Sequence, residues 1–195
     1  MWTVVSALKS EIRPLFDVFS VEEKLKFAEG SLYQCKGLHI LRTGIGNGAA
    51  RSAFSSYLQK FNPQKVLNLG LAGALGQNLK HGQMCNVRNV HHADHPQSYD
   101  LNLLQGIPDT ISCKLLTVVD AVTDANYRNL LYGQYQAELV DMEGFILAKI
   151  CNERHIPFYA LKIISDFADQ NTERDFKKNY QLLSKKLCSS IVSYL

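Results

Sequence analysis

The sequence predicts an α/β fold built on a mainly parallel β-sheet. Short apolar runs typical of buried strands alternate with stretches in which apolar residues recur at helical spacing. The 195 residues are 46% hydrophobic, which is sufficient for a buried core, and no linker rich in proline, glycine or serine divides them. We therefore expect one domain spanning residues 1–195.

The expected strands are short apolar runs bounded by polar residues, glycine or proline. In chain order they are Trp2–Ala7, Leu32–Cys35, Leu38–Thr43, Val66–Leu69, Met84–Val90, Leu115–Val119 and Pro157–Ile164. Runs of this length favour strands over helices. Ligands of such folds bind where the carboxyl ends of the strands meet the loops, so residues that follow these runs are candidates for the site.

The expected helices are stretches with helical periodicity. They are Ser10–Phe19, Ala49–Lys60, Val140–Glu153 and a last helix that Thr172 is placed to cap. Pro14 suits the first turn of the first helix because it needs no hydrogen-bond partner there. Gly44–Gly48 lacks the spacing of a dinucleotide-binding loop. It is either a tight strand-to-helix turn or a backbone that a ligand can approach closely.

Composition and charge exclude several classes of protein. With 21 Lys and Arg against 18 Asp and Glu, the net charge of +3 does not favour a nucleic-acid-binding protein. The lysines near the C-terminus are expected to form a solvated helix face; they are Lys177, Lys178, Lys185 and Lys186. No apolar run approaches the ~20 residues needed to span a bilayer.

The N-terminus and the cysteines predict a cytoplasmic location. Trp2–Leu8 is short, and basic residues follow it instead of preceding it, so we expect no export signal. The five cysteines are odd in number and widely scattered. They are typical of reduced, buried side chains and not of a disulfide framework.

The histidine-rich segment from His91 to His95 raises the alternative of a metal site. His91 and His95 would share a face if the segment were helical, but Pro96 and the polar surroundings argue against a helix. No second cluster in the sequence supplies further ligands. A plain polar loop is the favoured interpretation, and we expect neither a metal nor an organic cofactor.

Three carboxylates lie just beyond apolar strands or at the start of a helix. Glu11 follows the first strand, Glu143 lies in the segment expected to begin a helix, and Asp166 ends the last strand beside Ser165. Each one alone has a structural explanation as a group solvated by loop amides. Because strand ends of one sheet converge, the three together predict acid–base chemistry, in which one carboxyl donates a proton and another stabilises a developing cation.

These segments resemble the purine nucleoside phosphorylase-like superfamily, particularly its methylthioadenosine/S-adenosylhomocysteine nucleosidase and futalosine hydrolase branch. The matching segments occur in the family's order and cover nearly the whole chain. They are Val4–Leu8 leading to Glu11, Thr43–Gly46, Asn68–Gly73, Val140–Gly144 and Ile163–Asp166 with Ala168 and Asp169. The resemblance implies a three-layer α/β/α sandwich with a central twisted, mixed but mainly parallel sheet.

The same resemblance implies cleavage of the N-glycosidic bond of a purine nucleoside. Asp166 matches the general acid that acts on N7 of the leaving base. Glu143 matches the carboxylate that binds ribose hydroxyls and steadies the oxocarbenium-like transition state, and Glu11 matches the residue that orients or activates the attacking water. Residues matching substrate-binding positions are Leu8, Ala72, Gly73, Val122, Thr123, Met142, Ser165 and Phe176, together with Lys162 as a retained positive charge near the water. Without the resemblance, Lys162 is equally well a strand lysine that faces solvent.

Hydrolysis is favoured over phosphorolysis. Phosphorylases need basic groups that converge on phosphate, whereas Asn68 and Leu71 stand where the hexameric bacterial phosphorylases carry an arginine and a serine. We therefore expect a cytoplasmic nucleosidase that forms a homodimer and acts on a methylthioadenosine-like or other 5′-modified purine nucleoside. The alternatives are a phosphorylase and a catalytically weak nucleoside-binding protein of the same fold. The region between Gly82 and Asp120 is shorter than in typical members of the family.

Overall fold

The computed structural model describes residues 1–27 and 29–195, and in this part of the chain ten strands form one mixed sheet. The strands are β1 (Trp2–Ser6), β2 (Val21–Lys26), β3 (Ser31–Cys35), β4 (Leu38–Arg42), β5 (Lys65–Ala74), β6 (Met84–His92), β7 (His95–Asp100), β8 (Thr110–Thr117), β9 (Leu139–Asp141) and β10 (Phe158–Asp166). Each predicted strand overlaps one of them.

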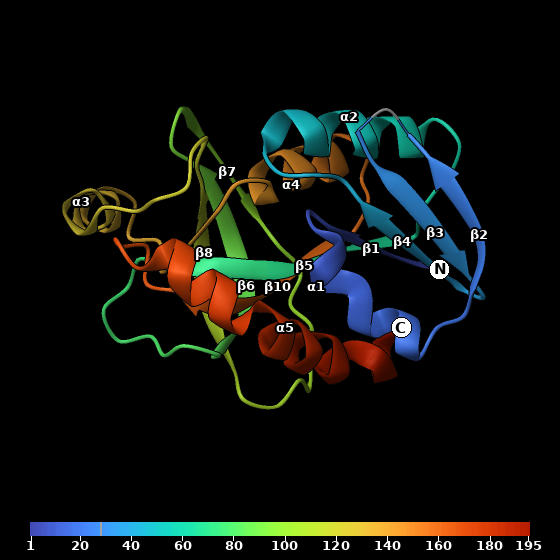
Figure 1. Cartoon of the computed structure of the whole chain (residues 1–195). Helices are drawn as coiled ribbons and strands as arrows, with labels where there is room; N and C mark the ends of the chain where they lie inside the picture. The colour runs from blue at the N-terminus through green and yellow to red at the C-terminus, as the bar shows by residue number, and fades with distance from the viewer. Residues whose placement is uncertain (28) are drawn as a thin grey trace.

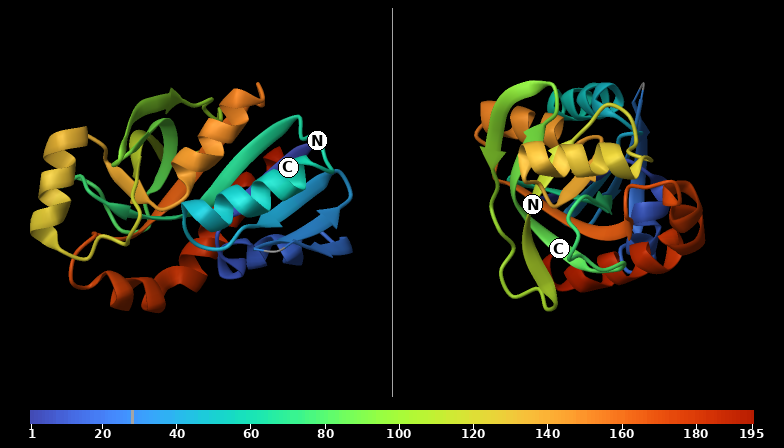
Figure 2. Two further views of the ribbon diagram at one scale, coloured as in Figure 1. Left: turned by 90° about the horizontal axis from the view of Figure 1, so that it is seen from above. Right: turned by 90° about the vertical axis from the view of Figure 1, so that its left-hand side faces the viewer.

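Helices are interspersed between these strands (Figure 1). They are α1 (Lys9–Ile12), α2 (Asn47–Leu58), α3 (Ala125–Tyr135), α4 (Gly144–Glu153) and α5 (Thr172–Ile191), with short 3₁₀ helices at Arg13–Asp17 and Val192–Tyr194. Helices α2 and α4 pack together on one face of the sheet, and α1 and α5 pack together on the other (Figures 1 and 2). The predicted α/β class is confirmed.

Strand β5 is the centre of the sheet. It pairs in parallel with β1 and β10 and antiparallel with β9, while β4, β3 and β2 continue the sheet beyond β1. Strands β5, β10, β6, β8 and β9 also pair in a closed ring, so this half of the sheet curves back on itself. The carboxyl ends of β1, β5 and β10 therefore lie at one edge, and the antiparallel β9 places Val140 beside Gly73 at the same edge. The segments that follow these strands meet there.

The alternation of side chains along β5 divides the core between the two faces. Val66, Ala72 and Ala74 belong to the cluster beneath α2 and α4, whereas Leu67 and Leu69 pack toward α1 and α5. Because β5 is buried on both faces, its sequence is a continuous apolar run and not an alternating one. A rigid strand of this kind holds its carboxyl end in a fixed place.

Two predicted helices differ from the structure. The prediction of a single helix over Ser10–Phe19 is wrong, because α1 ends at Ile12 and a 3₁₀ helix follows it. Pro14 lies at the start of this 3₁₀ helix and has no N–H with which to continue the α-helical hydrogen bonds. The helix predicted for Val140–Glu153 starts only at Gly144. Val140 instead pairs with Gly73 of β5 and with Leu116 of β8 as part of β9.

Three elements gave too little sequence signal to be predicted. Strands β2 and β7 are mostly exposed and lie at the margins of the sheet, so they lack an apolar pattern. Helix α3 buries only Leu131 and lies away from the main body (Figure 1). The interpretation of the histidine-rich segment as a polar loop is wrong: His91 and His92 end β6, and His95 begins β7, paired with His92 in a hairpin. The described residues contain no group of three or more metal-ligating side chains.

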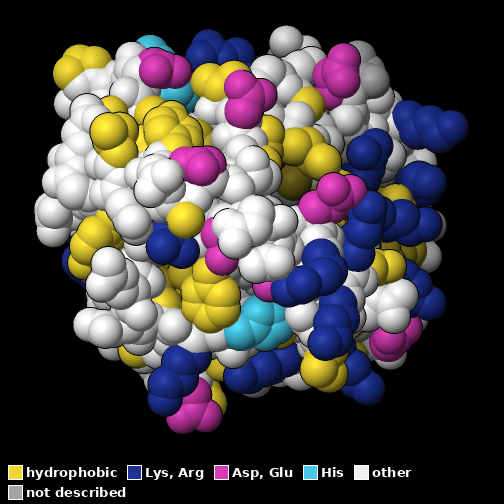
Figure 3. All heavy atoms as spheres, turned by 60° about the vertical axis from the view of Figure 1, so that its left-hand side comes forward, with side chains coloured by type: hydrophobic (Ala, Val, Ile, Leu, Met, Phe, Trp, Pro, Cys, Tyr) yellow, Lys and Arg dark blue, Asp and Glu magenta, His cyan; other side chains and the backbone are white. Residues whose placement is uncertain are grey.

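The surface agrees with the charge pattern of the sequence. The four lysines of α5 predicted to be solvated are all exposed. On the face drawn in Figure 3, hydrophobic side chains lie exposed between acidic and basic ones, and Lys and Arg side chains gather toward one side. No helix among the described residues is long and apolar enough to cross a membrane.

Candidate active site

A cavity of about 350 Å³ lies at the converging carboxyl ends of the central strands. Its lining residues come from the segments after β1, β4 and β8, from β9 and the segment after it, from the ends of β5 and β10, and from the first turns of α5. They are Ala7, Leu8, Glu11, Ile45, Leu71, Ala72, Gly73, Val118, Ala121, Val122, Thr123, Val140, Asp141, Met142, Glu143, Ser165, Asp166, Thr172, Glu173 and Phe176. From the shortened region between Gly82 and Asp120, all of which the structure describes, only Val118 lines the cavity.

The structure brings together almost all of the residues that the sequence predicted for the site. Glu11, Glu143 and Asp166 line the same cavity although they come from three separate elements. All of the predicted substrate-binding residues except Lys162 line it as well. Lys162 lies behind the wall, 2% exposed, so the alternative of a strand lysine that faces solvent is wrong.

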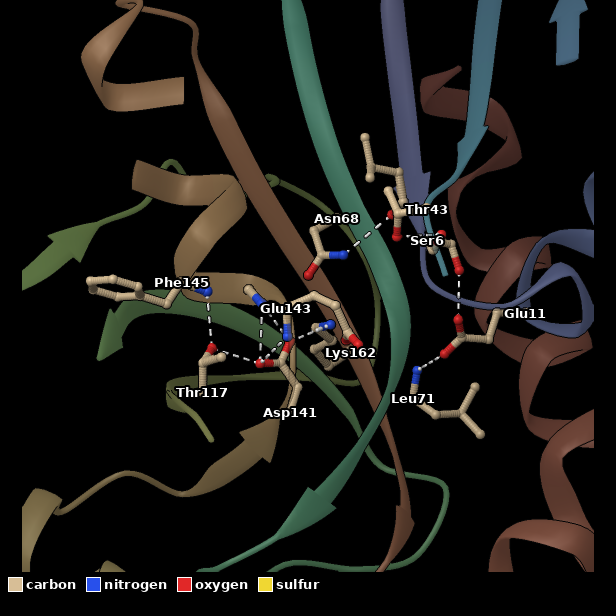
Figure 4. A network of polar contacts seen from close by, with 12 residues as sticks. Ser6, Glu11, Thr43, Asn68, Leu71, Thr117, Asp141, Glu143, Phe145 and Lys162 are labelled. Atoms are coloured by element: carbon tan, nitrogen blue, oxygen red, sulfur yellow. Dashed lines mark hydrogen bonds and ion pairs between the residues drawn. The ribbon is translucent and has the colours of Figure 1, made fainter. Parts of the chain in front are cut away.

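Glu11 lies in the first turns after β1, and three donors hold its carboxylate. Oε2 accepts hydrogen bonds from Ser6 Oγ (2.6 Å) and from the Leu8 amide (2.9 Å), and Oε1 accepts one from the Leu71 amide (2.9 Å; Figure 4). The bond to Leu8 also caps the start of α1. A Cβ on Gly70 would lie 2.8 Å from Oε1, so glycine leaves the space that the carboxylate occupies.

Glu143 immediately precedes α4, and its carboxylate reaches across to the turn after β4. Its Oε1 accepts a hydrogen bond from the Gly46 amide at 2.6 Å. Gly44 and Gly46 both have φ of 90°, a conformation that favours glycine, and Ile45 between them lines the cavity. The glycine segment is therefore both a strand-to-helix turn and part of the cavity wall.

The environment of Glu143 raises its pKa toward neutral pH. Burial raises the pKa of Glu143 to about 7, and the neighbouring Asp141 carboxylate adds to this effect. The Gly46 hydrogen bond and the charge of Lys162 act in the opposite direction. A carboxyl group with this pKa changes its charge near neutral pH, which suits a group whose charge matters for a reaction.

Asp166 ends β10 and is held by groups on both of its oxygens. Oδ1 accepts hydrogen bonds from the Ala168 amide (3.0 Å) and from Thr172 Oγ1 (3.1 Å), and Oδ2 accepts one from Ser165 Oγ (2.6 Å). Thr172 was predicted to cap α5, but Asn171 occupies that position without a side-chain cap. The Thr172 hydroxyl instead connects the start of α5 to Asp166.

Lys162 forms a buried ion pair beside these carboxylates. Its Nζ lies 2.8 Å from Asp141 Oδ2, and Asp141 Oδ1 also accepts a hydrogen bond from Thr117 Oγ1 at 2.7 Å (Figure 4). Burial lowers the pKa of Lys162, but the charge and hydrogen bond of Asp141, together with the charges of Glu143 and Glu11, raise the pKa above its ordinary value. The lysine therefore remains charged within the protein.

Sequence reasoning missed several residues of the site. Asp141 and Thr117 form the network around Lys162, while Thr172 and Ser6 hold the catalytic candidates Asp166 and Glu11. Asp141 directly precedes Met142 and Glu143, so its position was a usable signal. Thr117 carries no such signal, because only the pairing of β8 with β9 brings it near the site. Ser6 lies only five residues before Glu11, so its position was a usable signal as well.

The cavity is acidic and otherwise largely apolar. Its acidic lining residues are Glu11, Asp141, Glu143, Asp166 and Glu173. None of the described lining residues is a lysine, arginine or histidine. Phe176 stacks on Tyr180, with ring centroids 5.8 Å apart, and presents an aromatic surface at the wall. The arrangement suits a flat, uncharged organic molecule that develops positive charge as it reacts.

Comparison with known proteins finds nucleosidases among the relatives of this chain. A model of the family described as the phosphorylase superfamily matches residues 117–195. The 5′-methylthioadenosine/S-adenosylhomocysteine nucleosidase of Staphylococcus haemolyticus is 25% identical over 222 residues, covering 98% of this chain and 97% of that protein. A nucleosidase of the same name from Buchnera aphidicola (strain Bp) is 26% identical over 220 residues, covering 97% of this chain and 86% of that protein.

Solved structures share the fold. Futalosine hydrolase of Helicobacter pylori has a TM-score of 0.87 at 19% identity and covers 100% of this chain and 97% of its own. The Neisseria meningitidis 5′-methylthioadenosine/S-adenosylhomocysteine nucleosidase in complex with methylthio-immucillin-A has a TM-score of 0.87 at 21% identity. This match covers 100% of this chain and 99% of that chain. These findings confirm the resemblance of the chain to the phosphorylase superfamily and to its nucleosidases, and they show that the fold is shared with futalosine hydrolase.

Proposed function

We propose that the chain is a nucleosidase that hydrolyses the N-glycosidic bond of a purine nucleoside. The observation that carries this proposal is the convergence of Glu11, Glu143 and Asp166 on one cavity. Three carboxylates around an apolar cavity suit a reaction that builds positive charge on a sugar and needs a proton on its leaving group. The similarity to nucleosidases over nearly the whole chain supports the same activity.

In this mechanism Asp166 acts on the leaving base. Its carboxyl group donates a proton to N7 of the purine while the bond between C1′ and N9 breaks, and the electron pair of that bond stays on the base. The purine then departs as a neutral molecule. The hydrogen bonds from Ala168, Thr172 and Ser165 fix the orientation of the carboxyl group, so little reorganisation is needed when the proton moves.

Glu143 and Glu11 act on the ribose side. The ionised carboxylate of Glu143 accepts hydrogen bonds from ribose hydroxyls and stabilises the cationic sugar. Glu11 takes a proton from the water molecule whose oxygen forms the new bond to C1′. Since Ser6, Leu8 and Leu71 already bind both of its oxygens, the carboxylate is held in place before the water attacks.

The charge of the cavity supports hydrolysis over phosphorolysis. Phosphate needs cationic donors, and the described lining contains carboxylates without a lysine, arginine or histidine. Lys162 lies behind the cavity lining, where its ammonium group is paired with the carboxylate of Asp141. Asn68 donates to the Val5 carbonyl, and Leu71 contributes an apolar side chain, so neither supplies a cation to the cavity.

We further propose a 5′-modified purine nucleoside as substrate and a cytoplasmic homodimer as the working form. The names of the relatives support the substrate class. Exposed apolar side chains near the cavity and on α3 support a partner surface; they are Ile45, Val119, Tyr127 and Leu130. The free state of all five cysteines suits a reducing compartment.

The experiment is a panel of purine nucleosides incubated with the purified protein, with and without phosphate. We expect free base and free sugar to form at the same rate in both conditions. Formation of a sugar 1-phosphate that depends on phosphate would identify a phosphorylase instead. Saturable binding without turnover would identify a nucleoside-binding protein and overturn the proposal.

A further inference from the structure

His92 lies at the end of β6, outside the cavity, and has contacts on two sides. Its Nε2 lies 2.9 Å from the side-chain amide of Asn47, the first residue of α2. Its ring packs against the ring of Phe145 in the first turn of α4, with centroids 5.2 Å apart. The side chain is buried, with 5% exposure. His92 therefore bridges the starts of two helices.

These two helix starts are the segments that form the hydrogen bond of Glu143. Asn47 directly follows Gly46, whose amide donates to Glu143 Oε1 at 2.6 Å. Phe145 follows Glu143 by two residues, and its own amide donates to Thr117 Oγ1 at 2.9 Å (Figure 4). A movement of either segment would lengthen the Gly46–Glu143 hydrogen bond.

The hydrogen bonds of His92 define its protonation. Nδ1 accepts a hydrogen bond from the Asp94 amide at 2.9 Å, so in the neutral ring the proton lies on Nε2. The atom 2.9 Å from Nε2 is Asn47 Nδ2, which is also a donor, whereas the buried Asn47 Oδ1 has no partner. Exchanging the amide oxygen and nitrogen of Asn47 lets Nε2–H donate to Oδ1 and satisfies both groups. Burial lowers the pKa of His92, and the neighbouring His95 adds to that effect, so the neutral ring is favoured.

We propose that His92 is a positioning residue for Glu143, which it serves by holding Asn47 and Phe145 so that the Gly46 amide stays against the carboxylate. The catalytic consequence rests on the proposed function, whereas the structural linkage does not. His92 touches neither the cavity nor the reacting atoms. Its effect would pass through the backbone of the glycine turn and the first turn of α4.

The test compares His92→Phe with His92→Gln. Phenylalanine keeps the ring that packs on Phe145 but cannot donate to Asn47, whereas the glutamine amide can replace the Nε2–H donor. We expect His92→Phe to lower kcat about tenfold, the order of one weakened hydrogen bond to a charged group, and His92→Gln to restore most of the loss. Asn47→Ala should resemble His92→Phe, and combining the two should add little.

The pH profile of kcat separates positioning from a general loss of structure. The Gly46 hydrogen bond lowers the pKa of Glu143, so weakening it should move the acidic limb to higher pH. The other charged groups facing Glu143 are Asp141, Lys162 and Glu11, and these variants leave them in place. His95→Phe is the matched control, because His95 stacks on Phe145 at 5.4 Å and has no hydrogen bond to Asn47 among the described contacts.

Amide hydrogen exchange tests the linkage without substrate. Exchange at Gly46 and Asn47 should be faster in His92→Phe than in the wild type and close to wild type in His92→Gln and His95→Phe. Unchanged exchange together with an unchanged pH profile would overturn the proposal. If the wild type had no nucleosidase activity but exchange responded as expected, the proposed function would fail while the linkage would stand.

Discussion

Lys162 Nζ lies 2.8 Å from Asp141 Oδ2, and each side chain is only 3% exposed. The pair connects β10 to β9: Asp141 belongs to the cavity lining, and Lys162 lies behind it. Removal of one partner from a buried ion pair leaves a charge without compensation, which is far more costly than removing both. The pair therefore fixes two strand ends that carry catalytic candidates.

We expect Lys162→Met to lower the free energy of unfolding by about 3 kcal/mol, and Asp141→Asn to have an effect of similar size. The double variant should lose clearly less than the sum of the two. Chemical denaturation of the four proteins at pH 7 measures this coupling. Additive losses would show that the two charges do not stabilise each other.

Glu143→Gln should stabilise the protein at alkaline pH while it abolishes activity. The pKa of Glu143 is about 7 in the folded protein against an ordinary value of 4.5, so its favourable contribution is complete below pH 4.5 and is lost as the pH rises through 7. At pH 8 the variant should exceed the wild type by up to about 3 kcal/mol, and the difference should shrink toward pH 4.5. Thermal denaturation across this range gives the result; a difference independent of pH would contradict the assignment.

Asp166→Asn should lower kcat/KM for release of the base by about 10²- to 10⁴-fold, because the amide cannot donate an acidic proton to the leaving group. The amide oxygen can still accept from the Ala168 amide, so folding should be retained. Asp169→Asn is the control, since Asp169 accepts from the Asn171 amide outside the cavity. Full activity in a folded Asp166→Asn variant would exclude the assigned role.

Gly70→Ala should reduce activity by displacing Glu11. The added Cβ would lie 2.8 Å from Glu11 Oε1, and the carboxylate would have to leave its hydrogen bond to the Leu71 amide. Gly48→Ala in α2 is the matched variant, because its Cβ meets nothing within 4 Å. It should retain activity and gain a few tenths to about 1 kcal/mol in stability. Steady-state kinetics and denaturation of both variants separate the two effects.

The sequence predicted the strands that are buried on both faces and the carboxylates that follow them. Continuous apolar runs such as Val66–Leu69 indicate central strands directly, because burial on both sides removes polar residues from the pattern. The strands at the margins of the sheet could not be predicted in this way. Strands β2 and β7 bury little, and the partner strand across the ladder decides their structure.

Glu11, Glu143 and Asp166 could be selected from the sequence because each lies beside a recognisable strand end or motif. Their convergence on one cavity is a consequence of the sheet order, which places β1, β5, β9 and β10 together. The same order gives Lys162 its partner Asp141 and gives Glu143 its donor Gly46. Local sequence thus determined which side chains were available for chemistry. The tertiary structure alone decided their partners and their charge, because hydrogen bonds and burial arise between segments that are distant in the chain.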